Sequence, residues 1–197
     1  MTQVKSAHLD EAGLRALGLD YATRYGGTTA SMARILDRRI QRWERAMLAT
    51  EGADPEAVAG EAASLREAAG RVVASLASIG AVDDAAFAAS RARRLRRSGR
   101  SRLAVLAHLG AKGVGASLAG ATVPEDEAAE FAAALAFARR RRVGPFAREG
   151  DDQSEAGDRV RVLMAFGRAG FSGVMARRAL ECSPEEAERM LRAQPPE

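Results

Sequence analysis

The chain has 197 residues, of which 47% are hydrophobic and only 5% aromatic, and its formal net charge is +4. Its apolar content is carried mainly by alanine, which excludes a β-rich fold and predicts an all-α protein with helix-on-helix packing. A single cysteine, Cys182, excludes a disulfide framework and suits a reducing compartment. No stretch resembles a signal peptide or reaches the roughly 18 apolar residues of a membrane span, so we expect a cytoplasmic protein.

Helical periodicity predicts three helices in the first 80 residues. The first covers residues 9–26. Thr28 is placed to cap a second helix that runs to about Leu48, and a third ends at Gly80. Acidic residues, glycines and Pro55 make residues 50–60 a predicted loop. The candidate core residues are Leu14, Leu17, Ala22 and Tyr25 in the first helix and Met32, Ile35, Leu36, Ile40 and Trp43 in the second.

The stretch from Gly80 to Val123 is predicted to form three short helices. Asp83 caps the first and Ser101 the second. The second helix is expected to bury Leu103, Leu106 and Leu109 and to end at Gly110 and Gly113. The third covers about residues 115–122.

Arginine is concentrated in this central stretch. Between residues 91 and 102 the arginines are Arg91, Arg93, Arg94, Arg96, Arg97, Arg100 and Arg102, and no carboxylate lies among them. The stretch could be a solvated helix face, but self-repulsion of this size favours a polyanion or an acidic protein surface as partner. The predicted contact residues also include Lys112 and a second basic run, Arg139, Arg140, Arg141 and Arg142. That run equally complements a helix dipole.

Further helices are predicted after Pro124, which is tolerated in a first helical turn. The first of these helices is expected to bury Phe131, Leu135 and Ala138. Residues 147–157 are a predicted loop, and helices follow at about 157–169 and 172–181. Ser183 then opens a short terminal helix with a capping box.

An internal repeat organises the chain. A shift of 57 positions places residues 101–123 over residues 158–180, with apolar positions and both glycines retained, and a weaker copy starts at Thr28. This predicts three helix-turn-helix-like three-helix repeats in an elongated, curved array. The expected boundaries are 9–80, 81–123 and 124–182, followed by a helix and tail over 183–197.

No constellation of catalytic residues is evident. His108 is expected to be an ordinary helical residue, no metal-ligand spacing occurs, and the glycines match no phosphate-binding loop. We therefore expect no catalytic residue, metal or cofactor. Two alternatives to regulation by docking stay open: a small helix-turn-helix DNA-binding protein, whose predicted reading helix lacks charge, and a passive helical adaptor.

Two motifs then carry a family resemblance. They are V-x-x-L-x-x-x-G-x-x-D-D-x-x-F-A over Val73 to Ala88, and a looser arginine, glycine and lysine pattern over Arg96 to Val114. With the closing copy VLMAFGRAGFSGVMARRAL, they resemble the RecX family, which regulates the RecA recombinase.

The resemblance implies three tandem three-helix repeats and a non-enzymatic protein that mainly inhibits RecA. Such a protein binds the RecA filament on single-stranded DNA and limits its extension. It thereby damps ATP hydrolysis, recombination and the co-protease activity of the SOS response. The expected partner is this nucleoprotein filament, with direct contact to single- or double-stranded DNA left open, and the expected state is a monomer.

Overall fold

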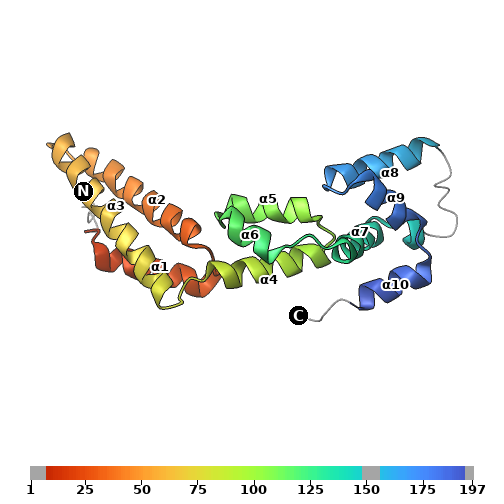
Figure 1. Ribbon diagram of the computed structural model, residues 1–197. Helices are drawn as coiled ribbons and strands as arrows, with labels where there is room; N and C mark the ends of the chain where they lie inside the picture. The colour runs from red at the N-terminus through yellow and green to blue at the C-terminus, as the bar shows by residue number, and fades with distance from the viewer. Residues whose placement is uncertain (1–7, 148–155, 194–197) are drawn as a thin grey trace. The chain divides into compact units, whose positions relative to one another are not determined.

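The computed structural model describes residues 8–147 and 156–193, with side chains from Asp158 onward in the second range. In these ranges the chain forms ten α-helices, one 3-10 helix and no strand (Figure 1), which confirms the all-α prediction. The helices follow one another as three triplets, α1–α3, α4–α6 and α7–α9, and then α10. The predicted repeat boundaries stay a prediction, since one compact unit can hold more than one repeat.

The chain divides into two compact units. The first holds the chain up to Phe87 together with Lys112–Val114. The second holds Ala88–Ala111 and the chain from Gly115 onward.

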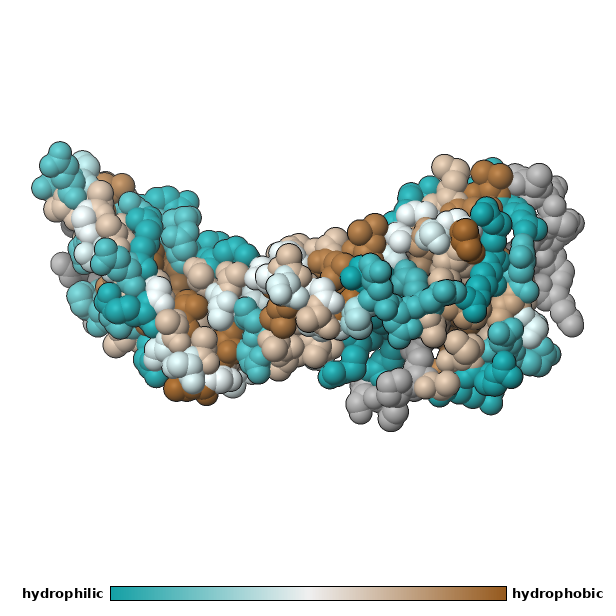
Figure 2. All heavy atoms as spheres, in the orientation of Figure 1, coloured by the Kyte–Doolittle hydropathy of each residue, from teal (hydrophilic) through white to brown (hydrophobic). Residues whose placement is uncertain are grey.

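Three helices build the first unit: α1 (Glu11–Tyr25), α2 (Thr29–Leu48) and α3 (Pro55–Ser78). Asp10, Thr28 and Asp54 cap them by accepting hydrogen bonds from backbone N–H groups near each start. The core holds the predicted α2 stripe, whose buried members are Met32, Leu36, Ile40 and Trp43. The outward side of α2 forms a hydrophilic band (Figure 2).

Two predictions for this unit were wrong. Residues 50–60 are not all loop, because Asp54 caps α3 and Pro55 takes its first position, where the missing N–H costs nothing. Tyr25 is not a core residue: it is 73% exposed at the end of α1. Leu14 is fully buried as expected.

The second unit is packed around α7 (Glu127–Arg141), whose residues Phe131 and Leu135 are buried as predicted. Phe137 meets Phe166 with ring centroids 4.7 Å apart, and Phe166 meets Phe171 at 5.7 Å. The other helices are α4 (Asp84–Arg97, whose first four residues belong to the first unit), α5 (Arg102–Lys112), α6 (Ala116–Thr122), α8 (Ala156–Arg168), α9 (Gly173–Glu181) and α10 (Pro184–Arg192).

Three details of the central and C-terminal helices differ from the prediction. Helix α7 starts at Glu127 and not at Pro124, because the Asp126 carboxylate caps it by accepting from Ala129 N–H at 3.0 Å. Gly110 lies inside α5, which ends only before Gly113. Leu103 is 65% exposed. Of the predicted loop over 147–157, residues 148–155 lie outside the described residues, and Ala156 and Gly157 belong to α8 instead.

The 57-residue repeat is visible in the structure. It relates α5 to α8 and α6 to α9. Leu109 and its counterpart Phe166 are both fully buried. Gly113 and its counterpart Gly170 both adopt a left-handed backbone, with φ of 88° and 87°, so the same turn follows both helices.

A buried hydroxyl closes the start of α2. The Thr28 hydroxyl accepts a hydrogen bond from Ser31 N–H at 3.0 Å and donates one to the Lys112 carbonyl at 2.6 Å. The Asp84 carboxylate accepts from Thr29 N–H at 2.7 Å and from the Thr29 hydroxyl at 2.9 Å. A Cβ on Gly113 would lie 2.3 Å from the Ala30 Cβ, so only glycine fits against this cap.

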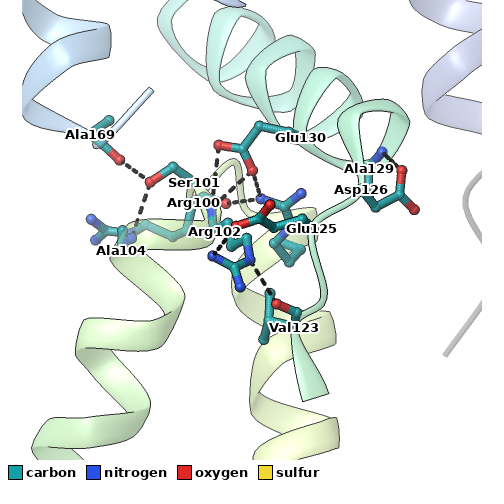
Figure 3. A network of polar contacts seen from close by, with 11 residues as sticks. Arg100, Ser101, Arg102, Ala104, Val123, Glu125, Asp126, Ala129, Glu130 and Ala169 are labelled. Atoms are coloured by element: carbon teal, nitrogen blue, oxygen red, sulfur yellow. Dashed lines mark hydrogen bonds and ion pairs between the residues drawn. The ribbon is translucent and has the colours of Figure 1, made fainter. Parts of the chain in front are cut away.

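The start of α5 is closed in the same way (Figure 3). The buried Ser101 hydroxyl accepts from Ala104 N–H at 3.1 Å and donates to the Ala169 carbonyl at 2.7 Å. The Glu130 carboxylate accepts from Arg102 N–H at 3.0 Å. A Cβ on Gly170 would lie 2.4 Å from the Ser101 hydroxyl oxygen. The structure therefore repeats one capping arrangement at two places in the chain.

Candidate functional site

The arginine-rich stretch is held by the turn between α4 and α5. Gly99 in this turn has φ of 77°, and a Cβ there would lie 2.5 Å from the Phe137 backbone nitrogen. Arg140 donates to the Ser98 carbonyl at 2.8 Å. Because the turn rests on α7, the structure brings the stretch 91–102 beside the second basic run, a juxtaposition that spacing alone does not indicate.

Two of the predicted contact arginines serve the fold. The Arg96 guanidinium pairs with the Glu130 carboxylate, and these side chains are 16% and 21% exposed. Arg102 donates to the Val123 carbonyl at 2.8 Å and lies 3.6 Å from the Glu125 carboxylate. No carboxylate occurs inside the stretch, but α7 and the segment before it supply two. Arg96 and Arg102 are therefore part of the scaffold of the second unit.

Arg91 also makes an internal contact. Its Nε donates to His108 Nε2 at 2.9 Å, and both side chains are half-buried. His108 thus accepts a hydrogen bond that links α4 and α5.

The remaining arginines of the stretch differ in exposure. Arg93, Arg94 and Arg100 are exposed, while Arg97 is half-buried. Among the described residues, no carboxylate lies within ion-pair distance of Arg93 or Arg94. The exposed part of the basic stretch is thus narrower than the sequence indicates, and it is centred on the last turns of α4.

A groove of about 330 Å³ lies beside these arginines, between the end of α4 and the start of α7. Arg93, Arg96 and Arg97 line it on the α4 side and Asp126 lines it on the α7 side. Its remaining lining residues are Ala89, Ala92, Thr122, Val123, Pro124, Ala129, Ala132 and Ala133. The groove therefore combines an aliphatic floor with one cationic rim.

The second basic run is partly engaged with α7 and α10. Arg139 lies 3.9 Å from the Glu188 carboxylate. The guanidinium carbons of Arg140 and Arg141 lie 5.6 and 5.4 Å from the centroid of the Phe137 ring. Arg142 ends α7 in a left-handed conformation, with φ of 56°. Four cations at a helix C-terminus also complement its dipole.

Comparison with known proteins decides the family. The model of the RecX second three-helix domain matches residues 83–122. The regulatory protein RecX of Myxococcus xanthus strain DK1622 is 33% identical over 184 residues, which cover 92% of this chain and 89% of that protein. The chain belongs to the RecX family. No solved structure matches it.

Within this RecX-family chain, the matched segment spans the whole of α4, α5 and α6 and contains the whole stretch from Arg91 to Arg102. The second basic run lies outside it. Lys112 also lies in the matched segment, but it belongs to the first unit, where its backbone carbonyl accepts a hydrogen bond from the Thr28 hydroxyl. The exposed Lys112 side chain is thus not assigned to the same surface as Arg93 and Arg94.

A row of arginines on α2 was missed from the sequence. Arg34, Arg38, Arg42 and Arg45 are spaced three or four residues apart and are exposed. The carboxylates of the same helix, Asp37 and Glu44, are both engaged by Arg66 of α3, at 3.4 and 2.7 Å. The hydrogen bonds with these carboxylates, Glu44 first, raise the pKa of Arg66. The helical spacing of the four arginines could have revealed the row, but the engagement of Asp37 and Glu44 could not be foreseen.

Two further observations concern the ionisable side chains and the helices of the described residues. They contain no cluster of three or more histidine, cysteine, aspartate or glutamate side chains placed to hold a metal ion. Burial, with the nearby Glu186 carboxylate, raises the pKa of the Cys182 thiol, whereas a reactive thiol needs it lowered. None of the described helices combines the length and low polarity required to cross a bilayer.

Proposed function

We propose that this RecX-family chain regulates RecA by docking on the RecA filament assembled on single-stranded DNA. Docking limits extension of the filament and so lowers its ATPase, recombination and co-protease activities. The observation that carries the proposal is the exposed cationic surface of Arg93 and Arg94 inside the segment that the family model matches. The protein acts as a cytoplasmic monomer and changes the filament without making or breaking covalent bonds.

The surface suits a docking role for electrostatic reasons. Two exposed guanidinium groups that have no carboxylate partner among the described residues raise the potential of the α4 end and attract acidic groups. Arg96 and Glu130 hold the same helix end in place from beneath. The cations are therefore presented on a fixed surface, which lowers the entropy lost on association.

The test is the DNA-dependent ATPase of RecA on single-stranded DNA, with the full chain titrated in after the filament has formed. We expect the rate of ATP hydrolysis to fall as the protein is added. If the protein limits filament extension, the full effect should be reached with fewer than one molecule per RecA protomer. Unchanged hydrolysis and unchanged filament length in electron micrographs would contradict it.

Direct contact with DNA is a second part of the proposal, and the α2 row favours it. Exposed arginines four residues apart rise about 6 Å along a helix, which is comparable to the spacing of successive phosphates in a single strand. Replacing Arg38 and Arg42 by alanine should reduce the salt dependence of binding to naked poly(dT), by about 0.7 in log–log slope for each lost phosphate contact. An unchanged slope would exclude α2 from DNA contact.

A helix-turn-helix DNA-binding protein is the competing function. It predicts a sequence preference on naked duplex DNA and no dependence on RecA. The described residues of α6 carry no charged side chain, so this helix offers only Ser117 and Thr122 to base edges. Binding of random and defined duplexes with equal affinity would dismiss it.

A further inference from the structure

The groove between α4 and α7 has a floor that suits aliphatic groups. Ala92, Val123, Ala132 and Ala133 are buried at its base, while Ala89 is half-buried and Ala129 is exposed at its mouth. None of the described residues that line it is aromatic. A nucleic-acid base would find no ring to stack on, whereas a branched aliphatic side chain would bury its surface against methyl groups.

The charges around the groove are divided between its two sides. Arg93 stands exposed on the α4 side. Asp126 lines the α7 side, and its exposed neighbours Glu125 and Glu127 lie 3.6 Å from the Arg102 and 2.6 Å from the Arg178 guanidinium, respectively. A phosphate backbone, which is negative along its whole length, would be repelled by the Asp126 carboxylate on that side. A peptide can place one carboxylate on the arginine side and neutral groups on the other.

We infer that this groove receives a protein segment in which an aliphatic side chain is flanked by an aspartate or glutamate. The aliphatic group enters between α4 and α7, and the acidic group pairs with Arg93. The inference rests on the proposed function, since the segment would lie on a RecA protomer of the filament. It assigns the protein contact to the second unit and leaves any DNA contact to other surfaces.

The groove can be filled from its mouth. Ala129→Leu adds a branched side chain at an exposed lining position. Ala128→Leu adds the same side chain at the neighbouring exposed position of α7, which does not line the groove. Because both positions are exposed, both variants are expected to keep the far-UV spectrum and melting temperature of the wild type.

The experiment measures binding of each labelled full-length protein to RecA filaments on poly(dT) and to naked poly(dT). Ala129→Leu should weaken filament binding at least about tenfold, Ala128→Leu should change it by less than about twofold, and neither should alter binding to naked DNA. Equal filament binding by both variants overturns the groove assignment. So does an equal loss on naked DNA, because nucleic acid would then occupy the groove.

A second measurement does not depend on a larger side chain. In a Cys182→Ser background, Ala129→Cys should react with a maleimide in the free protein and be protected when filaments are added. Ala128→Cys should react equally in both states. Equal reactivity of the cysteine at 129 with and without filaments overturns the inference. If the wild type does not bind filaments at all, the proposed function is overturned, and so is the assignment of a RecA segment to the groove.

Discussion

The starts of α2 and α5 are closed by matching contacts, yet they differ in one respect. Each has a buried hydroxyl, a carboxylate from a later helix and a left-handed glycine that approaches the cap. At α2 the carboxylate is Asp84, whose hydrogen-bond partners among the described residues are the backbone N–H and the hydroxyl of Thr29. At α5 the carboxylate is Glu130, which also holds Arg96. The second cap thus uses an arginine of the basic stretch as a structural part.

This difference separates two kinds of arginine that look alike in the sequence. Arg96 is needed by the fold, whereas Arg93 and Arg94 are exposed and do not contribute to either cap. Charge reversal across the whole stretch would therefore mix unfolding with loss of binding. The cap residues and the exposed arginines have to be tested separately.

The largest effects are expected at the two cap glycines. Gly113→Ala and Gly170→Ala should each lower the free energy of unfolding by about 3 kcal/mol, because alanine is strained at positive φ and its Cβ meets the opposing cap. Thermal unfolding followed by far-UV circular dichroism measures both. Two variants that melt like the wild type would show that the turns are not matched in the way described.

Removing the charge of the two cap carboxylates, Glu130 and Asp84, should lower the free energy of unfolding by different amounts. Glu130→Gln leaves the half-buried Arg96 cation without its charged partner and should cost about 2–3 kcal/mol. Asp84→Asn removes only cap hydrogen bonds and should cost about 1 kcal/mol. Urea denaturation of the two variants compares them, and equal losses would mean that the Arg96 ion pair adds no stability.

The hydroxyls should respond alike. Thr28→Val and Ser101→Ala each remove a fully buried hydroxyl that both accepts and donates, so each should cost about 1–2 kcal/mol. Faster amide hydrogen exchange at Ser31 and Ala104, respectively, is the local signature. Unaltered exchange at either amide would argue against that cap.

The other pair of repeated glycines should behave oppositely. Gly110 and Gly167 lie inside α5 and α8, and an added Cβ would meet nothing within 4 Å. Gly110→Ala and Gly167→Ala should therefore raise the free energy of unfolding by about 0.5–1 kcal/mol. A loss of stability would mean that these glycines share the role of Gly113 and Gly170.

Much of the fold could be predicted from local signals. Thr28, Asp83, Ser101 and Ser183 were identified as caps, and hydrogen bonds confirm each of them. The α2 stripe and the glycine pair at 113 and 170 were likewise found from spacing. The errors fall where two signals compete. Proline and glycine usually interrupt helices. Pro55 nevertheless takes the first position of α3 behind the Asp54 cap, and Gly110 lies inside α5.

The site was less predictable, because it depends on contacts between distant residues. The sequence shows that carboxylates are absent from residues 91–102, but not that Glu130 would reach Arg96 or that Arg140 would reach Ser98. It also cannot show which arginines stay exposed. The aliphatic groove is hidden for the same reason, since its alanines are spread over α4 and α7 and are unremarkable in composition.

The central claim is that the exposed arginines of α4 dock the protein on the RecA filament. It is tested most directly by comparing inhibition of the RecA ATPase by two charge-matched variants. One carries Arg93→Glu and Arg94→Glu; the control carries Arg168→Glu and Arg177→Glu, exposed positions of α8 and α9. We expect the first to need at least about tenfold more protein for half-inhibition while the control inhibits like the wild type. Equal inhibition by all three proteins would contradict the account.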